Sequence, residues 1–303
     1  MAELAQPAGM HNYKYDEEFA AAQLQYYRKN VDGQAQAHIN SMVGLIGNVK
    51  AKRILDLGCS IGTYARYYAR QGHWTVGVDA SPQVLAVAQR LAQEEGIRPC
   101  PFVLADIARQ SFREESFDLI IASDIFEHLP MGPLRKCIEE CWRILSWGAR
   151  LIVHTTPTRY EHMFDNTRGY LPLLPLRFLP GPLLDRVIEA YDRFRYEVLY
   201  KVTRGETRYD IYARSVHPNP LAYATLWRML QETGFTIDRY LVGNMPIDLQ
   251  RPQYSRACRL FPHAKNVYKH IWAVCRKPRT DMAANLASLE GAWEATEIWE
   301  VTA

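Results

Sequence analysis

The chain has 303 residues, of which 48% are hydrophobic and 23% charged, and its formal net charge is +3. This composition is typical of a soluble globular protein with one large core or a core and an appendage, and so small a charge does not favour nucleic acid as a partner. The six cysteines show no zinc-ribbon or secreted-disulfide spacing, and no acidic cluster suggests magnesium, so we expect no metal. The first residues do not resemble a signal peptide and no apolar run is long enough to span a bilayer, which predicts a cytoplasmic protein.

The segment before the first strand contains two predicted helices. Tyr15, Phe19 and Tyr26 recur at near-helical spacing, and a second helix is predicted over 34–46. These helices have two interpretations, which the sequence leaves open. They either cover the edge of a sheet or form a lid over a ligand, with Tyr13 and Tyr15 facing the site.

From Arg53 onward, strands and helices alternate regularly. We predict strands at 54–57, 74–78, 102–105, 117–123 and 150–155, and helices at 64–71, 82–94 and 132–145. The second of these helices has Ser81 as N-cap and Pro82 at its first position. Trp147-Gly148 is predicted to form a turn before the fifth strand. Strands separated by helices indicate right-handed crossovers and a parallel sheet.

After the fifth strand the alternation stops. A proline-rich and aromatic insertion precedes Asn219-Pro220, which we predict to cap another helix; two last strands follow at 236–242 and 268–275. The fold class predicted is therefore α/β, with a doubly wound, mostly parallel seven-stranded sheet. The predicted organisation is an N-terminal helical lid (1–50), a nucleotide-type core (51–156), an inserted and mainly helical substrate cap (157–217), the end of the core (218–278) and an acidic tail (279–303).

The turn between the first strand and its helix has three interpretations. A dinucleotide-binding turn requires G-x-G-x-x-G, but Ser60 replaces the middle glycine between Gly58 and Gly62. The segment also fits the G-x-S-x-G elbow of hydrolases with Ser60 as nucleophile, although no oxyanion loop of the HGGG type precedes it. The third interpretation is S-adenosylmethionine (SAM), which carries no phosphate and needs no phosphate cradle.

An acidic residue follows this turn at the end of the next predicted strand. Asp79 lies 21 residues after Gly58, where a carboxylate binds the two hydroxyls of a ribose. Asp79 would serve NAD and SAM equally well, so the later segments decide between them.

Several segments in register resemble the class I SAM-dependent methyltransferases of the small-molecule type, over about half of the chain. The segments are Leu55 to Gly62, Gly77 to Ser81, Ala105 to Ile107, Phe117 to Ile120 with Glu127 to Leu129, and Arg143 to Leu145 with Gly148 to Leu151. The end of the helix before the last two strands, Glu232 to Phe235, also resembles the segment before that family's final hairpin.

The resemblance implies SAM as cofactor and assigns roles to individual residues. Asp56, Gly58 and Gly62 would lie under the methionine moiety, and Ser60 would line the cofactor pocket. Asp79 would bind the ribose, with Ala80 and Ser81 beside the adenosine. Asp106 would accept a hydrogen bond from the adenine amino group, Ile107 would pack on the ring, and Ser123 would border the sulfonium.

Methyl transfer needs mainly alignment of the acceptor with the methyl group in a dry pocket. A base is needed only where the acceptor loses a proton. His128, just beyond the fourth strand, is the predicted base because an imidazole titrates near neutral pH, although Glu127-His128 also suits a purely structural role. Weaker candidates follow the fifth strand and lie in the insertion: His154, Tyr160, His162 and Tyr170.

The predicted acceptor is a hydrophobic or aromatic small molecule, methylated most often at oxygen and less often at carbon or nitrogen. The DNA amino-methylation signature is absent at Ser123, and no basic stripe favours nucleic acid. The apolar insertion suits such an acceptor, and residues 171–184 are also predicted to contact a membrane or a second copy of the chain. Two alternatives stay open: a SAM-binding enzyme with a non-methylating step such as cyclisation, and an α/β hydrolase using Ser60.

Overall fold

The computed structural model describes residues 16–30, 34–50, 53–97, 100–158, 167–205, 219, 221–244, 259–264 and 269–279. Within these ranges, no helix has the length and apolar character needed to cross a membrane. Tyr13 and Tyr15, which were predicted to face the ligand site, lie outside the described residues, as does the acidic tail beyond 279.

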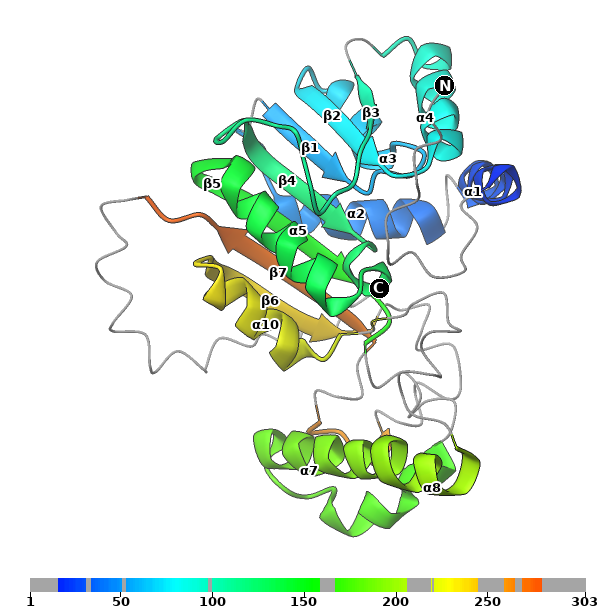
Figure 1. Ribbon diagram of the computed structural model, residues 1–303, viewed down its shortest axis with the longest axis vertical. Coiled ribbons are helices and arrows are strands. Elements are labelled where there is room, and N and C mark those ends of the chain that lie inside the picture. The colour runs from blue at the N-terminus through cyan, green and yellow to red at the C-terminus, as the bar shows by residue number, and fades with distance from the viewer. Residues whose placement is uncertain are drawn as a thin grey trace.

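A seven-stranded sheet forms the centre of the protein (Figure 1). Its strands are β1 Arg53–Leu57, β2 Trp74–Asp79, β3 Phe102–Leu104, β4 Phe117–Ser123, β5 Leu145–Thr155, β6 Thr236–Gly243 and β7 His270–Arg276. Their order in the sheet is β3-β2-β1-β4-β5-β7-β6. The first five strands are parallel, and β7 is antiparallel to both β5 and β6. The doubly wound, mostly parallel sheet predicted from the sequence is therefore confirmed.

The elements outside the sheet are mainly α-helices. They are α1 Glu17–Asn30, α2 Gln34–Ile46, α3 Thr63–Ala69, α4 Pro82–Glu94, α5 Met131–Ile144, α7 Gly181–Arg193, α8 Tyr200–Arg204 and α10 Tyr223–Glu232, with the 3-10 turns η1 Phe126–His128 and η2 Thr167–Leu176 and the π-helical turn η3 Phe194–Leu199. The helix predicted at 82–94 is observed with those bounds, and Ser81 caps it by accepting a hydrogen bond from the amide of Val84.

Both faces of the sheet are buried, which explains why its central strands are continuous apolar runs. Leu119 and Ile121 of β4 pack with α2 and α3 on one face. Ile120 and Ala122 of the same strand pack with α5 and α10 on the other. Figure 1 shows α5 in front of the sheet and α2 behind it. Successive side chains of a strand point to opposite faces, so one strand supplies both cores.

Two local predictions are wrong. The segment around Trp147-Gly148 is not a turn before the fifth strand, because β5 already begins at Leu145, where it pairs with Phe117 of β4. Asn219 does not cap the following helix. α10 begins at Tyr223, and the Asn219 side chain instead donates a hydrogen bond to the carbonyl oxygen of Leu129.

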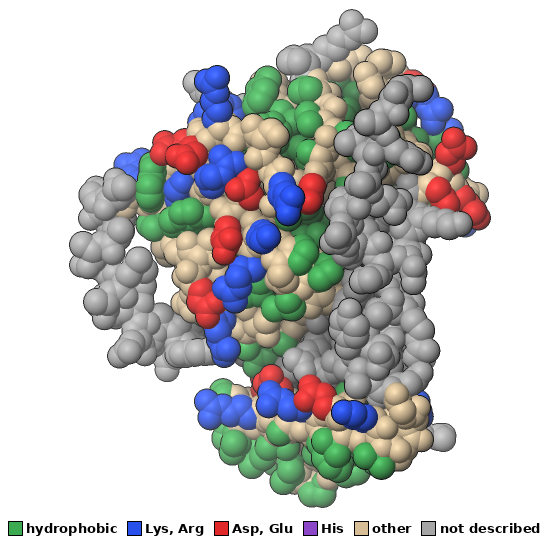
Figure 2. Space-filling view, viewed as in Figure 1, with side chains coloured by type: hydrophobic (Ala, Val, Ile, Leu, Met, Phe, Trp, Pro, Cys, Tyr) green, Lys and Arg blue, Asp and Glu red, His purple; other side chains and the backbone are tan. Residues whose placement is uncertain are grey.

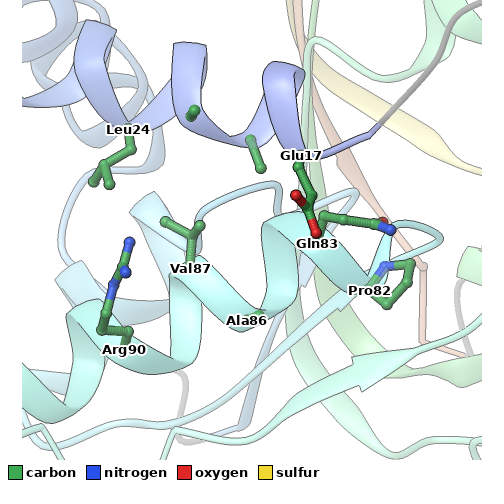
Figure 3. A pocket seen from close by; sticks show the side chains of 9 residues that line it. Glu17, Leu24, Pro82, Gln83, Ala86, Val87 and Arg90 are labelled. Atoms are coloured by element: carbon green, nitrogen blue, oxygen red, sulfur yellow. The ribbon is translucent and has the colours of Figure 1, made fainter.

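The two N-terminal helices lie at different places. α2 packs on the sheet face that also carries α3, whereas α1 lies along α4 (Figures 1 and 3). A pocket of about 480 Å³ lies between parts of α1 and α4. Its lining includes Leu24 and Val87 but none of the predicted cofactor residues. The lid function of α1 and α2 stays a prediction.

The described part of the insertion folds as a helical unit. α7, η3 and α8 form one continuous helical run that packs on η2 through Tyr170, Leu184 and Ile188, and this small core also receives Ala222 and Phe261. Figure 1 shows the unit below the sheet. Leu221, which precedes the Ala222 of this core, forms a bridge with Thr158, which follows β5. The predicted covering of the acceptor site by this unit stays a prediction.

Candidate functional site

The glycine turn after β1 depends on left-handed backbone conformations. Gly58 and Gly62 have φ of 67° and 75°, and Ser60 between them has φ of 47°. A Cβ atom on Gly58 would lie 2.6 Å from the side chain of Ile125, and one on Gly62 would lie 2.5 Å from the ring of Phe102. Both positions therefore need glycine for conformation and for space.

The Asp56 side chain is buried between the glycine turn and the start of α3. Its Oδ2 accepts a hydrogen bond of 2.9 Å from the amide of Ala65 in the first turn of α3. Burial raises the pKa of Asp56 to about 7. Its observed contact thus fixes the glycine turn to the helix that follows.

Asp79 links the glycine turn to the start of α4. Its Oδ2 accepts from the amide of Ser60 and its Oδ1 from the amide of Ser81, both at 2.9 Å. Burial raises the pKa of Asp79 above its ordinary value, although these amides oppose the shift. The side chain is half-buried, and each carboxylate oxygen has a further lone pair. Asp79 therefore keeps acceptor capacity for a ligand.

The residues predicted beside an adenosine follow β2 and β3. Ala80 is half-buried, whereas the Ser81 side chain is buried and caps α4. Asp106 is half-buried and accepts a hydrogen bond of 2.9 Å from the amide of Ala108. Ile107 is buried and packs in the core beside α5. The structure thus places Ala80 and Asp106 where a ligand can reach them, and Ser81 and Ile107 behind them.

Ser60 carries a hydroxyl group that the described residues leave unbonded. Its Oγ is buried and has no hydrogen-bond partner among them. Burying a hydroxyl without a partner costs free energy, of the order of 1–3 kcal/mol. A ligand bound beside the turn could form a hydrogen bond with this hydroxyl. The half-buried carboxylate of Asp79 could likewise accept hydrogen bonds from a ribose. These residues therefore fit the predicted cofactor.

A chain of polar side chains crosses the carboxyl ends of β4, β5 and the start of β7. Oδ1 of Asp124 lies 2.9 Å from Nδ1 of His154, and Nε2 of His154 lies 2.9 Å from Nδ1 of His270. His154 is fully buried, whereas the Asp124 side chain is 37% exposed. Trp272 packs against both imidazole rings. The chain therefore runs from an accessible carboxylate into the protein interior.

The backbone and neighbours of Asp124 hold it in place. Its φ of 54° is in the left-handed region, and its amide donates to the carbonyl oxygen of His154. The hydroxyl of Ser123 donates to Oδ2 of Asp124 at 3.3 Å. A non-glycine residue with positive φ at the end of a central strand is uncommon and often marks a functional site.

Glu127 lies close to Asp124 and is more deeply buried. It is buried, and its Oε2 accepts a hydrogen bond of 2.7 Å from the hydroxyl of Thr155. Burial, with the nearby charge of Asp124, raises the pKa of Glu127 well above its ordinary value. Burial and the like charge of Asp124 therefore both disfavour ionisation of Glu127.

The predicted base His128 ends η1 and is half-buried. Tyr170, a weaker candidate, is buried in the insertion, where its hydroxyl donates to Oδ1 of Asp192 at 2.7 Å. It therefore lies within the core of the helical unit. Tyr160 and His162 lie outside the described residues.

Sequence reasoning did not find that Asp124, His154 and His270 lie next to one another. The position of Asp124 directly after a buried strand was an available signal, because ligand sites of parallel sheets lie at the carboxyl ends of their strands. No local sequence pattern placed His270 at this site, because it is 116 residues from His154 in the chain.

Comparisons with known proteins support the resemblance. A family model described as a methyltransferase domain matches residues 54–148. The chain is 30% identical over 148 residues to a protein named as a probable chloroplastic tocopherol O-methyltransferase of Oryza sativa subsp. japonica, covering 48% of this chain and 40% of that relative. It is 33% identical over 100 residues to the 2-heptyl-1-hydroxyquinolin-4(1H)-one methyltransferase of Mycobacteroides abscessus, covering 33% and 44%. The matches thus span less than half the length of these curated relatives.

A solved structure shows the same fold. A SAM-dependent methyltransferase from Methanosarcina mazei aligns with a TM-score of 0.51 at 17% identity, over 78% of this chain and 97% of that one.

Proposed function

We propose that this chain, whose residues 54–148 match a methyltransferase domain, uses SAM to methylate a hydroxyl group on an apolar small molecule. The observation that carries the proposal is the position of Asp79. Its carboxylate joins the glycine turn at Ser60 to the N-terminus of α4 at Ser81 and remains half-buried at the end of β2.

The residues around the turn would hold SAM in distinct ways. Asp79 would accept hydrogen bonds from the ribose hydroxyls, and such charge-assisted bonds are stronger than neutral ones. The Ser60 hydroxyl, unbonded among the described residues, would bond to the cofactor. SAM supplies an activated methyl group on a sulfonium leaving group. The protein would then contribute mainly alignment and exclusion of water.

The nature of the acceptor is supported by two observations. One relative is named for methylation at oxygen, and the other for an acceptor with a heptyl chain and a hydroxyl group. The described insertion also supplies an apolar unit that packs with Ala222, next to the Leu221 that forms a bridge with Thr158 after β5. We therefore propose an apolar acceptor with a hydroxyl group.

A hydroxyl acceptor loses a proton on methylation, and two side chains near the end of β4 suit this role. His128 is the candidate from the sequence. Asp124 is the candidate from the structure, because its accessible carboxylate is adjacent to Ser123 and held by the buried His154. Nδ1 of His154 lies 2.9 Å from Oδ1 of this carboxylate, and Nε2 of His154 shares a hydrogen bond with Nδ1 of His270.

Isothermal titration and product analysis test the proposal together. We expect SAM and S-adenosylhomocysteine to bind, and NAD to show no binding. Mass spectrometry with SAM labelled in its methyl group would then detect a labelled product among apolar phenols and hydroxyquinolones, but not among matched acceptors that lack the hydroxyl. Binding of NAD in place of SAM would contradict the proposal.

A SAM-binding enzyme with a non-methylating step is the second candidate. It makes the same binding prediction, so consumption of SAM during turnover separates the two. The hydrolase alternative requires a histidine bonded to Ser60. The described residues place no hydrogen-bond partner on Ser60 Oγ, and a fluorophosphonate probe should leave this serine unlabelled.

A further inference from the structure

The helical unit of the insertion exposes an unusually apolar surface. Along the continuous run of α7, η3 and α8, five large apolar side chains are exposed: Leu183, Phe194, Val198, Leu199 and Val202. Most of them recur at helical spacing and so share one side of the run. The opposite side is also apolar and packs on η2 through Leu184 and Ile188. The run therefore has two apolar sides, of which only one is used in the described fold.

The neighbouring η2 segment extends this surface. Leu171, Leu176 and Phe178 are exposed as well. Phe178 is 75% exposed and Val202 is 80% exposed, which makes them the most exposed large apolar side chains described. We call these eight residues of η2, its following turn and the helical run the apolar face. Contiguous exposed apolar side chains of this kind mark interaction sites.

Figure 2 shows how hydrophobic and charged side chains are arranged on the helical unit. Hydrophobic side chains form the outer edge of the unit, farthest from the sheet, and a row of charged side chains lies between them and the rest of the molecule. In a monomer surrounded by water the outermost edge is ordinarily the polar one. The observed order is that of a helix lying in a membrane interface, with its apolar side in the acyl region and its charges at the headgroups.

The charges flanking the apolar face are mostly positive. Arg186, Arg193, Lys201 and Arg204 are exposed along the run. Glu197 is exposed and Glu189 half-buried on the same run, whereas Asp185 and Asp192 are buried and accept hydrogen bonds from Tyr223 and Tyr170. Exposed cations beside an apolar helix side attract anionic lipid headgroups, by about 1 kcal/mol for each Lys or Arg near the surface.

Arg204 and a further cation of the unit, Arg177, also pack on aromatic rings. The guanidinium of Arg177 lies 4.6 Å from the ring centre of Phe178, and that of Arg204 lies 4.4 Å from that of Tyr200. Such side chains cover apolar surface with their stems while the charged end reaches toward the headgroups. A second copy of this chain across a two-fold axis would bring like charges together, which disfavours a dimer through this face.

We propose that the apolar face docks the protein on a lipid surface with anionic headgroups. The helical run would lie along the interface, with Phe178, Phe194 and Val202 in the acyl region. Arg193 and Lys201 would contact the headgroups. This docking surface would allow the protein to meet apolar molecules dissolved in the bilayer.

Vesicle sedimentation with the full chain tests the proposal. We expect the protein to sediment with vesicles of phosphatidylcholine and phosphatidylglycerol, and less with phosphatidylcholine alone or at high salt. The double variant Phe178→Ser/Val202→Ser should lose on the order of tenfold in partitioning for each side chain removed. Arg193→Glu/Lys201→Glu should lose binding only to the anionic vesicles.

A matched control removes two exposed apolar side chains elsewhere. Leu104→Ser/Met131→Ser, on β3 and α5, should sediment as the unaltered protein does. Circular dichroism and SAM titration on every variant separate a folding defect, or a failure of the proposed cofactor, from a loss of docking. Absence of vesicle binding, or equal binding by all variants, would overturn the proposal. So would a dimer that Phe178→Ser/Val202→Ser dissociates while no vesicle binds.

Discussion

Oδ1 of Asp124 lies 2.9 Å from Nδ1 of His154, which joins the carboxyl ends of the neighbouring strands β4 and β5. The imidazole is fully buried and the carboxylate is partly exposed, so a ligand can reach only the Asp124 carboxylate of this pair. If the Asp124 carboxylate removes the proton from the acceptor hydroxyl, Asp124→Asn should lower kcat/KM by about 10²- to 10⁴-fold and leave SAM affinity unchanged. Steady-state kinetics with labelled SAM would measure the loss.

Two further variants make this result specific. Asp118→Asn makes the same change at the amino end of β4, where the carboxylate pairs with Arg53, and should leave kcat/KM unaltered. His128→Gln tests the base predicted from the sequence. A large loss with His128→Gln and none with Asp124→Asn would assign the proton to His128 instead.

Asp79→Ala should weaken SAM binding by about 10- to 100-fold, since hydrogen bonds to a charged group contribute roughly 1.5–3 kcal/mol. The same change removes the acceptor for the Ser60 and Ser81 amides. Asp79→Asn keeps one acceptor oxygen and should show a smaller loss. Isothermal titration measures both, and unchanged affinity in Asp79→Ala would exclude this carboxylate from the cofactor site.

Gly58→Ala should destabilise the fold by about 2–3 kcal/mol, from left-handed backbone strain and from contact of the new Cβ with Ile125. Gly72→Ala is the matched control, because Gly72 has φ of 86° with no atom near its Cβ position, so only the strain, about 1 kcal/mol, applies. In the double variant Gly58→Ala/Ile125→Ala the cost should be less than the sum of the single changes. Urea unfolding measures each value, and strict additivity would contradict the predicted contact.

Asp56→Asn should change how stability depends on pH. Because burial raises the pKa of Asp56 to about 7, the folded state binds its proton more tightly than the unfolded state. The carboxyl therefore lowers stability progressively as pH rises from about 4 to 7, by on the order of 4 kcal/mol in total. Melting temperatures should fall over this range in the unaltered protein and fall less in Asp56→Asn. The exposed control Glu94→Gln should follow the unaltered protein, and a parallel course for all three would refute the raised pKa.

Ser60→Gly should stabilise the ligand-free protein by about 1 kcal/mol, because it removes both the left-handed strain and the buried, unbonded hydroxyl. The same variant should bind SAM several-fold less tightly if the hydroxyl bonds to the cofactor. Ser60→Ala separates the two effects, since it loses the hydroxyl but keeps the strain. A lower melting temperature in Ser60→Gly would show that the hydroxyl already stabilises the turn.

Features with local causes could be predicted from the sequence. The bounds of α4 follow from Ser81 and Pro82 at its start, and β4 was predicted over its observed range because seven mostly apolar residues precede a polar loop. The carboxylate of Asp79 was likewise located from its spacing after Gly58. For α4 and β4 the residues that decide the structure are neighbours in the chain, and for Asp79 the signal is a regular spacing between the ends of two adjacent strands.

Features that depend on distant contacts could not be predicted. Asn219 resembles a helix cap, but its side chain finds the carbonyl of Leu129, and β5 starts early because Phe117 of β4 is available as a partner. The approach of His270 to His154 depends on β7 lying beside β5. Tertiary hydrogen bonds outweigh local preference at these positions.

The place of β7 between β5 and β6 also has a consequence for synthesis of the protein. β7 emerges from the ribosome after the other six strands of the described sheet, yet it pairs with two of them. Until residue 276 is available, the backbone groups of β5 and β6 that face β7 have no strand to pair with, and such open edges recruit other chains. A nascent chain of this protein is therefore most exposed to aggregation, and most dependent on chaperones, during the interval between completion of β6 and arrival of β7.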